Sequence, residues 1–276
     1  MKSKLNNQDT ISNNQLIINN QLSIINSRIV NWLLGFGHCL VIVSWLLVIC
    51  VPAAGLTGEQ IINRVDQNMT FSSSKSTAKM LIYVGDQIRT KEMVSYAQGR
   101  DKSFSEFTAP ARDKGVKYLK IDDNMWMYLP SVDKTIKIAG HMLRQSMMGS
   151  DFSYEDALES DQLLDKYDVK LVGEEDGSYI LELTAKVKEV TYFKRKLWVD
   201  KTKFVPVKEE LFAKSGKKLK VMELTDIKKF GSRYYPTKIT LKNLLRKDSK
   251  TEMMVESISF DVGVPAKIFS KANLTK

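Results

Sequence analysis

Apolar and polar residues alternate along most of the chain after Phe71. Met80 and Ile82, for example, share one side of such a segment, and the same alternation returns in residues 179–184, 193–199 and 235–241. A period of two sends successive side chains to opposite faces of a β-strand, so each segment predicts a strand with one face toward a core. Short turn-forming sequences such as Asp176-Gly177 separate the segments, which makes neighbouring strands antiparallel. We therefore expect ten to twelve antiparallel strands.

A short helix precedes the first strand. Ile61, Ile62 and Val65 recur at helical spacing behind a polar first turn. Thr57 or Gly58 stands where a helix cap is needed. The pattern predicts an amphipathic helix that begins at this point.

Residues 141–165 interrupt the alternation in the middle of the chain. Ser153 and Asp156 have the spacing of a capping box, and Gly149 is suited to end the turn before it. This region predicts two short helices inserted in a long connection between strands.

The first 54 residues differ from the rest of the chain. A polar stretch with Lys2, Lys4 and Arg28 precedes an apolar run over residues 29–51, and small residues follow. A basic start, an apolar core and a small-residue exit are typical of a secretory signal peptide. We therefore expect a leader over residues 1–54 and one exported domain over residues 55–276.

Two alternatives to a cleaved signal peptide stay open. The apolar run is long enough to span a bilayer, so the leader could remain as an anchor helix. Lipidation at Cys50 is less favoured, because the bulky Ile49 stands where a small residue is needed.

The leader changes what the composition implies. The whole chain has a formal net charge of +10, two Cys and two His. Both Cys residues and His38 lie in the leader, so the exported part holds 39 basic and 31 acidic residues, no Cys and only His141. It can form no disulfide, thiolate zinc site or cysteine nucleophile. A chain of about 220 residues can bury a sizeable core without such links.

The sequence predicts a protein that is not an enzyme and that needs no cofactor or metal. It contains no Gly-x-Ser-x-Gly, no phosphate-binding glycine loop and no His-Glu-x-x-His. Adjacent carboxylates such as Glu209 and Glu210 point to opposite faces of a strand and do not form an acid–base pair. The catalytic alternative is a hydrolase built around His141, although a lone His near a helix start is more often a capping or surface residue.

The net positive charge of the exported part limits the kinds of partner that it can bind. Lysines are spread through the predicted strands and are not gathered with stacking aromatic residues, so nucleic acid is not expected. Attraction to anionic lipid head groups suits dispersed charge better. The plainer explanation, a solvated outer face, stays open beside it.

Methionine and aromatic residues concentrate in the middle of the chain. Methionine is flexible and polarisable, and it suits adaptable surfaces that hold apolar ligands. A core filled by methionine explains the same composition equally well. The candidate ligand-binding residues are Trp126, Tyr128, Met147, Met148, Phe152 and Tyr154.

Four strings in this region and beyond resemble the outer-membrane lipoprotein-sorting (LolA-like) family of bacterial envelope proteins. The most specific is Met148-Gly-Ser-Asp-Phe-Ser-Tyr-Glu-Asp156, and the others cover residues 109–119, 123–130 and 233–236. The resemblance extends over residues 57–270. It implies a mainly β (α+β) fold: a single unclosed half-barrel of about eleven antiparallel strands, with helices covering the concave face. In that family the apolar cavity receives acyl chains of lipoproteins or other lipids.

Together these observations predict a periplasmic carrier that binds lipid or lipoprotein acyl chains and takes them through the cell envelope. We expect the six candidate residues to line its cavity or lid, with Gly149, Ser153 and Asp156 as the hinge and cap of the lid. The expected partners are lipids, lipoproteins and components of the inner and outer membranes, and the expected state is a monomer. The alternative is a membrane-anchored sensor or interaction module with the same half-barrel, which a retained leader would favour.

Overall fold

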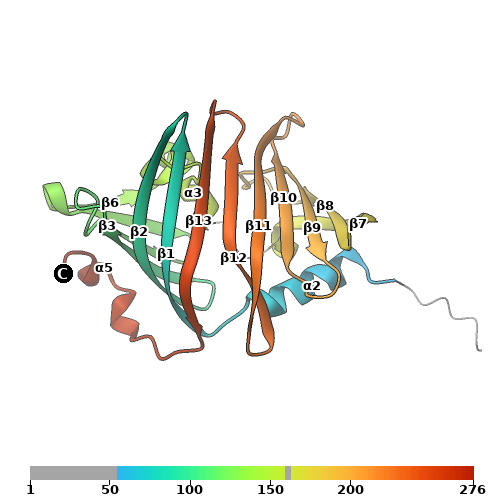
Figure 1. Cartoon of the computed structure of the whole chain (residues 1–276), viewed down its shortest axis with the longest axis horizontal. Coiled ribbons are helices and arrows are strands. Elements are labelled where there is room, and N and C mark those ends of the chain that lie inside the picture. The colour runs from blue at the N-terminus through green and yellow to red at the C-terminus, as the bar shows by residue number, and fades with distance from the viewer. Residues whose placement is uncertain (1–54, 159–162) are drawn as a thin grey trace, which may run out of the picture. The chain divides into compact units, whose positions relative to one another are not determined.

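The computed structural model describes residues 55–158 and 163–276, and the predicted leader lies outside these residues. Leu56–Lys276 form one compact unit. Its main element is a single antiparallel sheet of 13 strands in the order β6-β5-β4-β3-β2-β1-β13-β12-β11-β10-β9-β8-β7 (Figure 1). The strands are Ser73–Val84 (β1), Gln87–Gln98 (β2), Lys102–Ala109 (β3), Lys117–Ile121 (β4), Asn124–Leu129 (β5), Lys134–Ile138 (β6), Tyr167–Glu175 (β7), Ser178–Ala185 (β8), Lys194–Asp200 (β9), Pro206–Phe212 (β10), Lys218–Phe230 (β11), Arg233–Asn243 (β12) and Ser249–Phe260 (β13).

The helices are few and mostly short. The α-helices are Gly58–Met69 (α2), Tyr154–Leu158 (α3), Leu163–Lys166 (α4) and Lys271–Leu274 (α5), and the 3-10 turns are Pro130–Val132 (η1), Gly140–Arg144 (η2), Met147–Gly149 (η3) and Ala266–Ile268 (η4). Among residues 55–158 and 163–276, none of these helices has the length and apolar character needed to cross a bilayer.

The predicted half-barrel is confirmed, with 13 strands in place of about eleven. All of the segments with weak alternation form strands, including the five-residue β6. The first half of β1 is the part that alternation does not reveal, because Ser73 to Lys79 has few apolar residues. It is a strand because its backbone pairs with β2 on one side and with β13 on the other.

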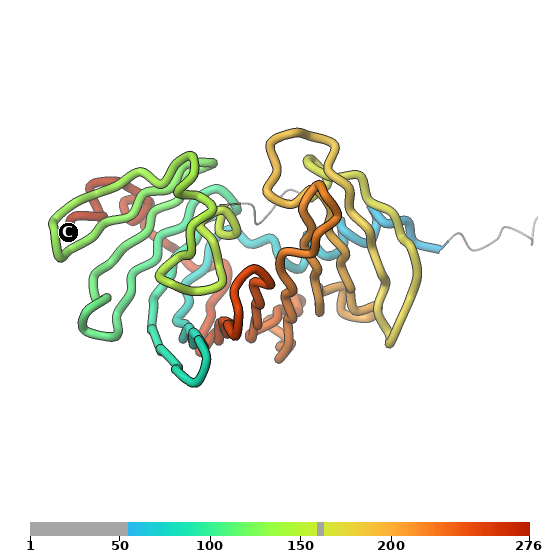
Figure 2. Tube along the Cα trace, turned by 90° about the horizontal axis from the view of Figure 1, so that it is seen from above, coloured from blue at the N-terminus to red at the C-terminus, as the bar shows by residue number. Residues whose placement is uncertain are grey.

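The pairing of β1 with β13 decides the shape of the sheet. It joins the first and last strands of the meander, so β6 and β7, which are consecutive along the chain, lie at opposite edges. These edges do not pair, and the curved sheet stays open between them (Figure 2). The connection from β6 to β7, which the structure describes over residues 139–158 and 163–166, lies on the open side. We call it the bridging segment, and we call the sheet face that it covers the inner face.

Helix α2 covers the other half of the inner face. Thr57 caps it as expected: the Thr57 hydroxyl accepts from the Gln60 amide, and the Gln60 side chain accepts from the Thr57 amide. Ile61, Ile62 and Val65 pack against β7, β8 and β9. Gly58 permits this close approach, because a Cβ there would lie 3.1 Å from the backbone nitrogen of Leu171.

The outer face of β3, β4 and β5 is covered by the C-terminal segment (Figure 1). Phe269 and Leu274 bury themselves against Phe104 and Leu119 there. Strand β4 is therefore packed on both faces, which explains why four of its five residues are buried.

Glu252 on the outer face of β13 makes the stability sensitive to acid. Its carboxylate lies 2.9 Å from Lys250 Nζ and 3.4 Å from Lys238 Nζ, and hydrogen bonding to these ammonium groups lowers the pKa of Glu252 below 4.5. A carboxylate whose pKa is lower in the folded state contributes stability above its unfolded pKa and loses it as the pH falls through the folded pKa.

We expect Glu252→Gln to lower the free energy of unfolding at neutral pH by roughly 0.5–1 kcal/mol and to flatten the loss of stability below about pH 4.5. Urea unfolding across that pH range measures both effects. Glu189→Gln, at an exposed carboxylate in the β8–β9 connection, is the control. An acid profile of Glu252→Gln that coincides with that of the control would contradict the assignment.

Candidate functional site

The bridging segment folds back on itself over the inner face (Figure 2). Its described parts are two 3-10 turns, η2 and η3, followed by the two short helices α3 and α4. Two helices were expected here, and the structure adds the two turns before them. Met148 and Gly149 adopt left-handed backbone conformations with φ of 55° and 80°, which reverse the chain so that the Met147 amide donates to the Phe152 carbonyl at 2.8 Å.

A methionine-rich apolar cluster lies between the bridging segment and strands β1 to β6. Phe107 and Tyr118 form its centre with a ring distance of 6.1 Å, and Tyr154 of α3 contacts Tyr118 at 5.9 Å. Burial raises the pKa of Tyr118, so its hydroxyl stays neutral. Of the 11 methionines in residues 55–276, eight belong to this cluster or pack against it. They are Met80, Met93, Met125, Met127, Met142, Met147, Met148 and Met253.

A second apolar cluster lies under α2. Leu181, Leu183, Leu197 and Val199 are buried there on β8 and β9. Strand register shows that this second cluster lies on the same face as the bridging segment. Residues that pair across neighbouring strands share a face, and the pairs run from Leu183 to Arg195, from Arg195 to Leu211 and from Leu211 to Lys220. Lys220 contacts the bridging segment.

An apolar row connects the middle of the sheet to the first cluster. In the register of the strands, Met80 of β1 lies opposite Met253 of β13, Met253 opposite Ile239 of β12, and Ile239 opposite Leu224 of β11. Met80 and Leu224 are buried, whereas Met253 and Ile239 keep part of their surface exposed. This row of the inner face is thus apolar from β1 across β13 and β12 to β11.

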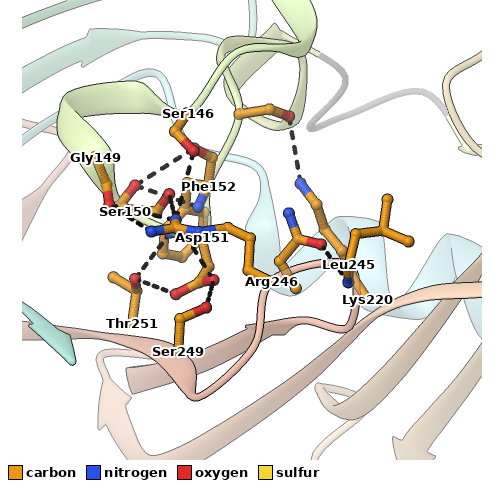
Figure 3. A network of polar contacts seen from close by, with 12 residues as sticks. Ser146, Gly149, Ser150, Asp151, Phe152, Lys220, Leu245, Arg246, Ser249 and Thr251 are labelled. Atoms are coloured by element: carbon orange, nitrogen blue, oxygen red, sulfur yellow. Dashed lines mark hydrogen bonds and ion pairs between the residues drawn. The ribbon is translucent and has the colours of Figure 1, made fainter. Parts of the chain in front are cut away.

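Asp151 fastens the bridging segment to the sheet (Figure 3). Its side chain is fully buried, and its carboxylate accepts from the Ser249 hydroxyl at 2.7 Å and from the Thr251 hydroxyl at 2.8 Å. The backbone amide of Asp151 donates to the same Thr251 hydroxyl at 2.9 Å. Both partners lie at the start of β13, about 100 residues away along the chain.

Arg246, in the β12–β13 connection, completes this fastening. Its Nη1 lies 3.6 Å from the Asp151 carboxylate and donates to the Ser150 carbonyl at 2.5 Å. It also donates to the Gly149 carbonyl at 3.3 Å. The guanidinium therefore binds two backbone carbonyls and one carboxylate of residues 149–151 at once. We call Asp151, Arg246, Ser249 and Thr251 the first latch.

Asp156 and Lys220 form a second latch on β11. Their side chains are 8% and 7% exposed, and Lys220 Nζ lies 2.5 Å from the Asp156 carboxylate. The carboxylate also accepts from the Ser153 amide at 2.6 Å, and the Asp156 amide donates back to the Ser153 hydroxyl at 3.3 Å. The expected capping pair of Ser153 and Asp156 is therefore present, and it carries a buried ion pair as well.

A small cavity of about 140 Å³ opens beside the second latch. Phe152 lines it from the bridging segment, Leu219 lines it from β11, and Tyr192 and Leu245 line it from the sheet connections. Tyr192 also donates a hydrogen bond to Asp156 from its hydroxyl.

The structure separates the six candidate residues into three groups. Met147, Met148 and Tyr154 belong to the methionine-rich cluster on the inner face, and Phe152 lines the small cavity. Trp126 and Tyr128 lie on the outer face, where they pack with the C-terminal segment.

Placing Trp126 and Tyr128 in an inner lining is therefore wrong. Alternation along β5 turns Met125 and Met127 inward, and it sends the two aromatic side chains to the other face. The Trp126 ring instead lies 4.3 Å from Lys271 Nζ of α5, and the Tyr128 hydroxyl donates to Asp133 at 2.9 Å.

Sequence reasoning missed the sheet side of both latches. Lys220 offered a signal, because it stands on the inner side of β11 in line with Met222 and Leu224. A cation in an apolar row needs a buried partner. Ser249, Thr251 and Arg246 offered none, because nothing local distinguishes them from other residues at a strand start.

The hydrolase alternative depends on His141. His141 is exposed in η2, and no hydrogen bond or ion pair joins it to another residue of the described part. Among residues 55–158 and 163–276, no three His, Cys, Asp or Glu side chains gather so as to hold a metal ion.

Comparison with known proteins shows which family the chain resembles. A family model described as "Uncharacterized protein" matches residues 99–276. A DUF1329 family protein from Desulfovibrio piger is 31% identical over 79% of this chain and 97% of its own, with a TM-score of 0.73. The chain belongs to the DUF1329 family. A search of curated proteins finds no significant match.

Two further solved structures share the LolA-like fold. An outer membrane lipoprotein-sorting protein domain from Vibrio parahaemolyticus is 23% identical, covers 79% of this chain and 98% of its own, and has a TM-score of 0.72. A LolA superfamily protein from Nitrosomonas europaea is 23% identical over 79% of this chain and 100% of its own, with a TM-score of 0.67. The resemblance noted in the sequence is confirmed. Both solved chains are matched over almost their whole length, and the matching part of this chain is the compact unit Leu56–Lys276.

Proposed function

We propose that this LolA-like protein binds the acyl chains of lipids or lipoproteins on its inner face and carries them through the periplasm. The observation that carries the proposal is the apolar row through Met253 and Ile239, which stays partly exposed in the middle of the inner face. An acyl chain laid along it would remove this surface from water, and each buried methylene contributes about 0.8 kcal/mol.

The composition of the inner face supports a flexible apolar ligand. Eight methionines gather at the first cluster, and unbranched methionine side chains adapt to chains of different length and branching. The name of the Vibrio relative, an outer membrane lipoprotein-sorting domain, points to the same class of cargo. In this role the protein performs no catalysis.

The bridging segment is the part that would admit and release the cargo. It is fastened by two polar latches, and each one joins it to a different strand or connection of the sheet. Charged and hydroxyl groups can exchange a protein partner for water more readily than packed apolar groups can. The segment can therefore open at the latches while its methionines remain available to the ligand. Gly149, in its left-handed turn, is the proposed hinge.

Met253 and Met254 allow a matched test, because they are neighbours on β13 that face opposite sides of the sheet. We expect Met253→Glu to weaken binding of a fluorescent fatty acid to residues 55–276 by at least about tenfold, since it puts a charge on the apolar row. Met254→Glu adds the same charge on the outer face and should leave binding unchanged. Titration of each protein with the fatty acid measures the two affinities.

Thermal melts of both variants separate loss of binding from loss of fold, and Ile239→Gln tests the same row with a neutral side chain. Mass spectrometry of lipids that co-purify from the envelope fraction gives an independent reading. Equal affinities of Met253→Glu and Met254→Glu, or the absence of acyl-containing species, would count against the proposal.

A further inference from the structure

Four hairpins lie side by side at one end of the sheet. The strand order places the β1–β2, β12–β13, β10–β11 and β8–β9 connections next to one another, and Figure 1 shows the first three at the top of the sheet. We call these four connections and the strand ends beside them, residues 84–89, 186–190, 213–218 and 242–250, the upper rim; the β3–β4 and β5–β6 connections lie at the same end and are not counted in it. The connections at the opposite end form the lower rim, which consists of residues 99–101, 122–123, 176–177, 201–205 and 231–232.

The upper rim exposes large apolar side chains. Leu244 and Leu245 are 49% and 59% exposed in the β12–β13 connection, and Ile88 is 58% exposed beside the β1–β2 turn. Together with Val84 and Val187, they account for five of the eight large apolar residues that the described part exposes, and none of the eight lies on the lower rim. Exposed apolar side chains gathered at one edge indicate a contact surface.

Charged residues are also distributed unequally between the two rims. The upper rim holds ten basic and three acidic residues, whereas the lower rim holds three basic and four acidic residues. Arg89, Lys217, Lys242 and Lys247 are exposed, with no ion pair to an acidic side chain of the described part. The upper rim therefore combines positive charge with exposed leucine, isoleucine and valine.

A cavity of about 440 Å³ lies in this rim between the β1–β2 and β12–β13 connections. Lys242, Arg246 and Lys250 line it, together with one acidic residue, Asp248, and the hydroxyl-bearing Tyr83 and Ser249. Arg246 holds the bridging segment and Lys250 pairs with Glu252, so Lys242 is the cation of this cavity that is best placed to meet a phosphate-bearing head group.

From these observations we propose that the upper rim docks on the surface of an anionic lipid bilayer. Leu244, Leu245 and Ile88 enter the boundary between head groups and acyl chains, while the surrounding lysines contact anionic head groups. Long lysine side chains suit this arrangement, because their methylene stems lie along apolar surface and their ammonium groups reach water and phosphate. The inference deepens the proposed function, since a carrier of acyl chains must meet a membrane in a fixed orientation.

The docking surface and the first latch share one connection. Arg246 follows Leu245 directly and holds the Gly149 and Ser150 carbonyls of the bridging segment. The upper rim is therefore the end of the sheet at which the bridging segment is fastened.

Vesicle flotation of residues 55–276 tests the docking. We expect binding to phosphatidylethanolamine vesicles with about a quarter phosphatidylglycerol, and little binding to phosphatidylcholine vesicles. Leu244→Ser with Leu245→Ser should reduce the bound fraction at least about fivefold. Val172→Ser with Met254→Ser removes two exposed apolar residues outside both rims and is the matched control.

The charge is tested in the same assay. Lys242→Glu with Lys247→Glu should weaken binding at least about tenfold, and about 0.5 M salt should have a similar effect on the unaltered protein. Lys170→Glu with Lys229→Glu gives the same net charge outside both rims and should retain binding. Equal binding to neutral and anionic vesicles, or rim variants that bind like their controls, would overturn the proposal. The second outcome would leave a protein partner as the better occupant of the rim.

The cargo proposal and the docking proposal can be refuted independently of each other. The upper-rim variants should keep the fatty-acid affinity of the unaltered protein in vesicle-free solution, and Met253→Glu should still float with anionic vesicles. Loss of fatty-acid binding with intact flotation refutes the cargo proposal alone, and the reverse result refutes docking alone.

Discussion

Replacing Asp151 with alanine should lower the free energy of unfolding by about 3–5 kcal/mol, which is the size expected when one partner of a buried charged network is removed. The change leaves the buried hydroxyl of Thr251 without its acceptor and deprives Arg246 of its carboxylate. It also releases the turn of the bridging segment whose carbonyls Arg246 holds. Because a loss of 1 kcal/mol shifts the melting temperature of a domain of this size by roughly 2–4 °C, melting should fall by roughly 6–20 °C.

Calorimetry or circular dichroism of residues 55–276 measures the shift. Asp165→Ala removes an exposed carboxylate from the same segment, and its melting temperature should stay near that of the unaltered protein. Asp151→Asn keeps the size and one acceptor oxygen and should fall between the two. A melting temperature for Asp151→Ala equal to that of Asp165→Ala would show that the first latch contributes nothing to stability.

The two latches explain why residues 148–156, the most specific part of the family resemblance, need particular residue types. Gly149 supplies the left-handed turn, Asp151 reaches the start of β13 and Asp156 reaches β11. Each requirement is specific to a residue type, whereas a strand needs only apolar residues at alternate positions. This explains why the string was distinctive in the sequence and the strand patterns were not.

The strands could be predicted because the sheet has one buried face nearly everywhere. Alternation follows from burial on one side, and it located β5 to the residue. The same rule, applied strictly, would have placed Met127 and Trp126 on opposite faces. The error with Trp126 arose from grouping residues by composition and not by strand face.

The long-range pairings could not be predicted in the same way. The contact of β1 with β13 and the bonds from Asp151 to Ser249 and Thr251 join residues far apart in the sequence. The residues around each partner do not reveal such contacts, because the same local sequence is compatible with several other pairing partners. The pairing of β1 with β13 nevertheless decides where the bridging segment runs, since it opens the sheet between β6 and β7 and sends the segment across the inner face.

The ion pair between Asp156 and Lys220 should show a coupling energy of at least about 2 kcal/mol in a double-mutant cycle. Lys220→Met leaves a buried carboxylate without its cation, and Asp156→Asn leaves a buried ammonium without its anion, so each single change should cost about 3 kcal/mol. The double variant removes both charges, and the amide oxygen introduced by Asp156→Asn can still accept from the Ser153 amide. It should therefore lose much less than the sum of the two single changes.

An exposed pair on the same sheet provides the reference for that cycle. Lys194 and Glu182 lie 2.7 Å apart on β9 and β8, but their side chains are 39% and 34% exposed. Water screens this pair, so the cycle with Lys194→Met and Glu182→Gln should give a coupling of only about 0–1 kcal/mol. Equal couplings for the two pairs would mean that Lys220 is no more than a neighbour of Asp156. A larger coupling for the buried pair would establish that the bridging segment is held to β11 by charge, which is the kind of contact that a segment able to open can give up to water.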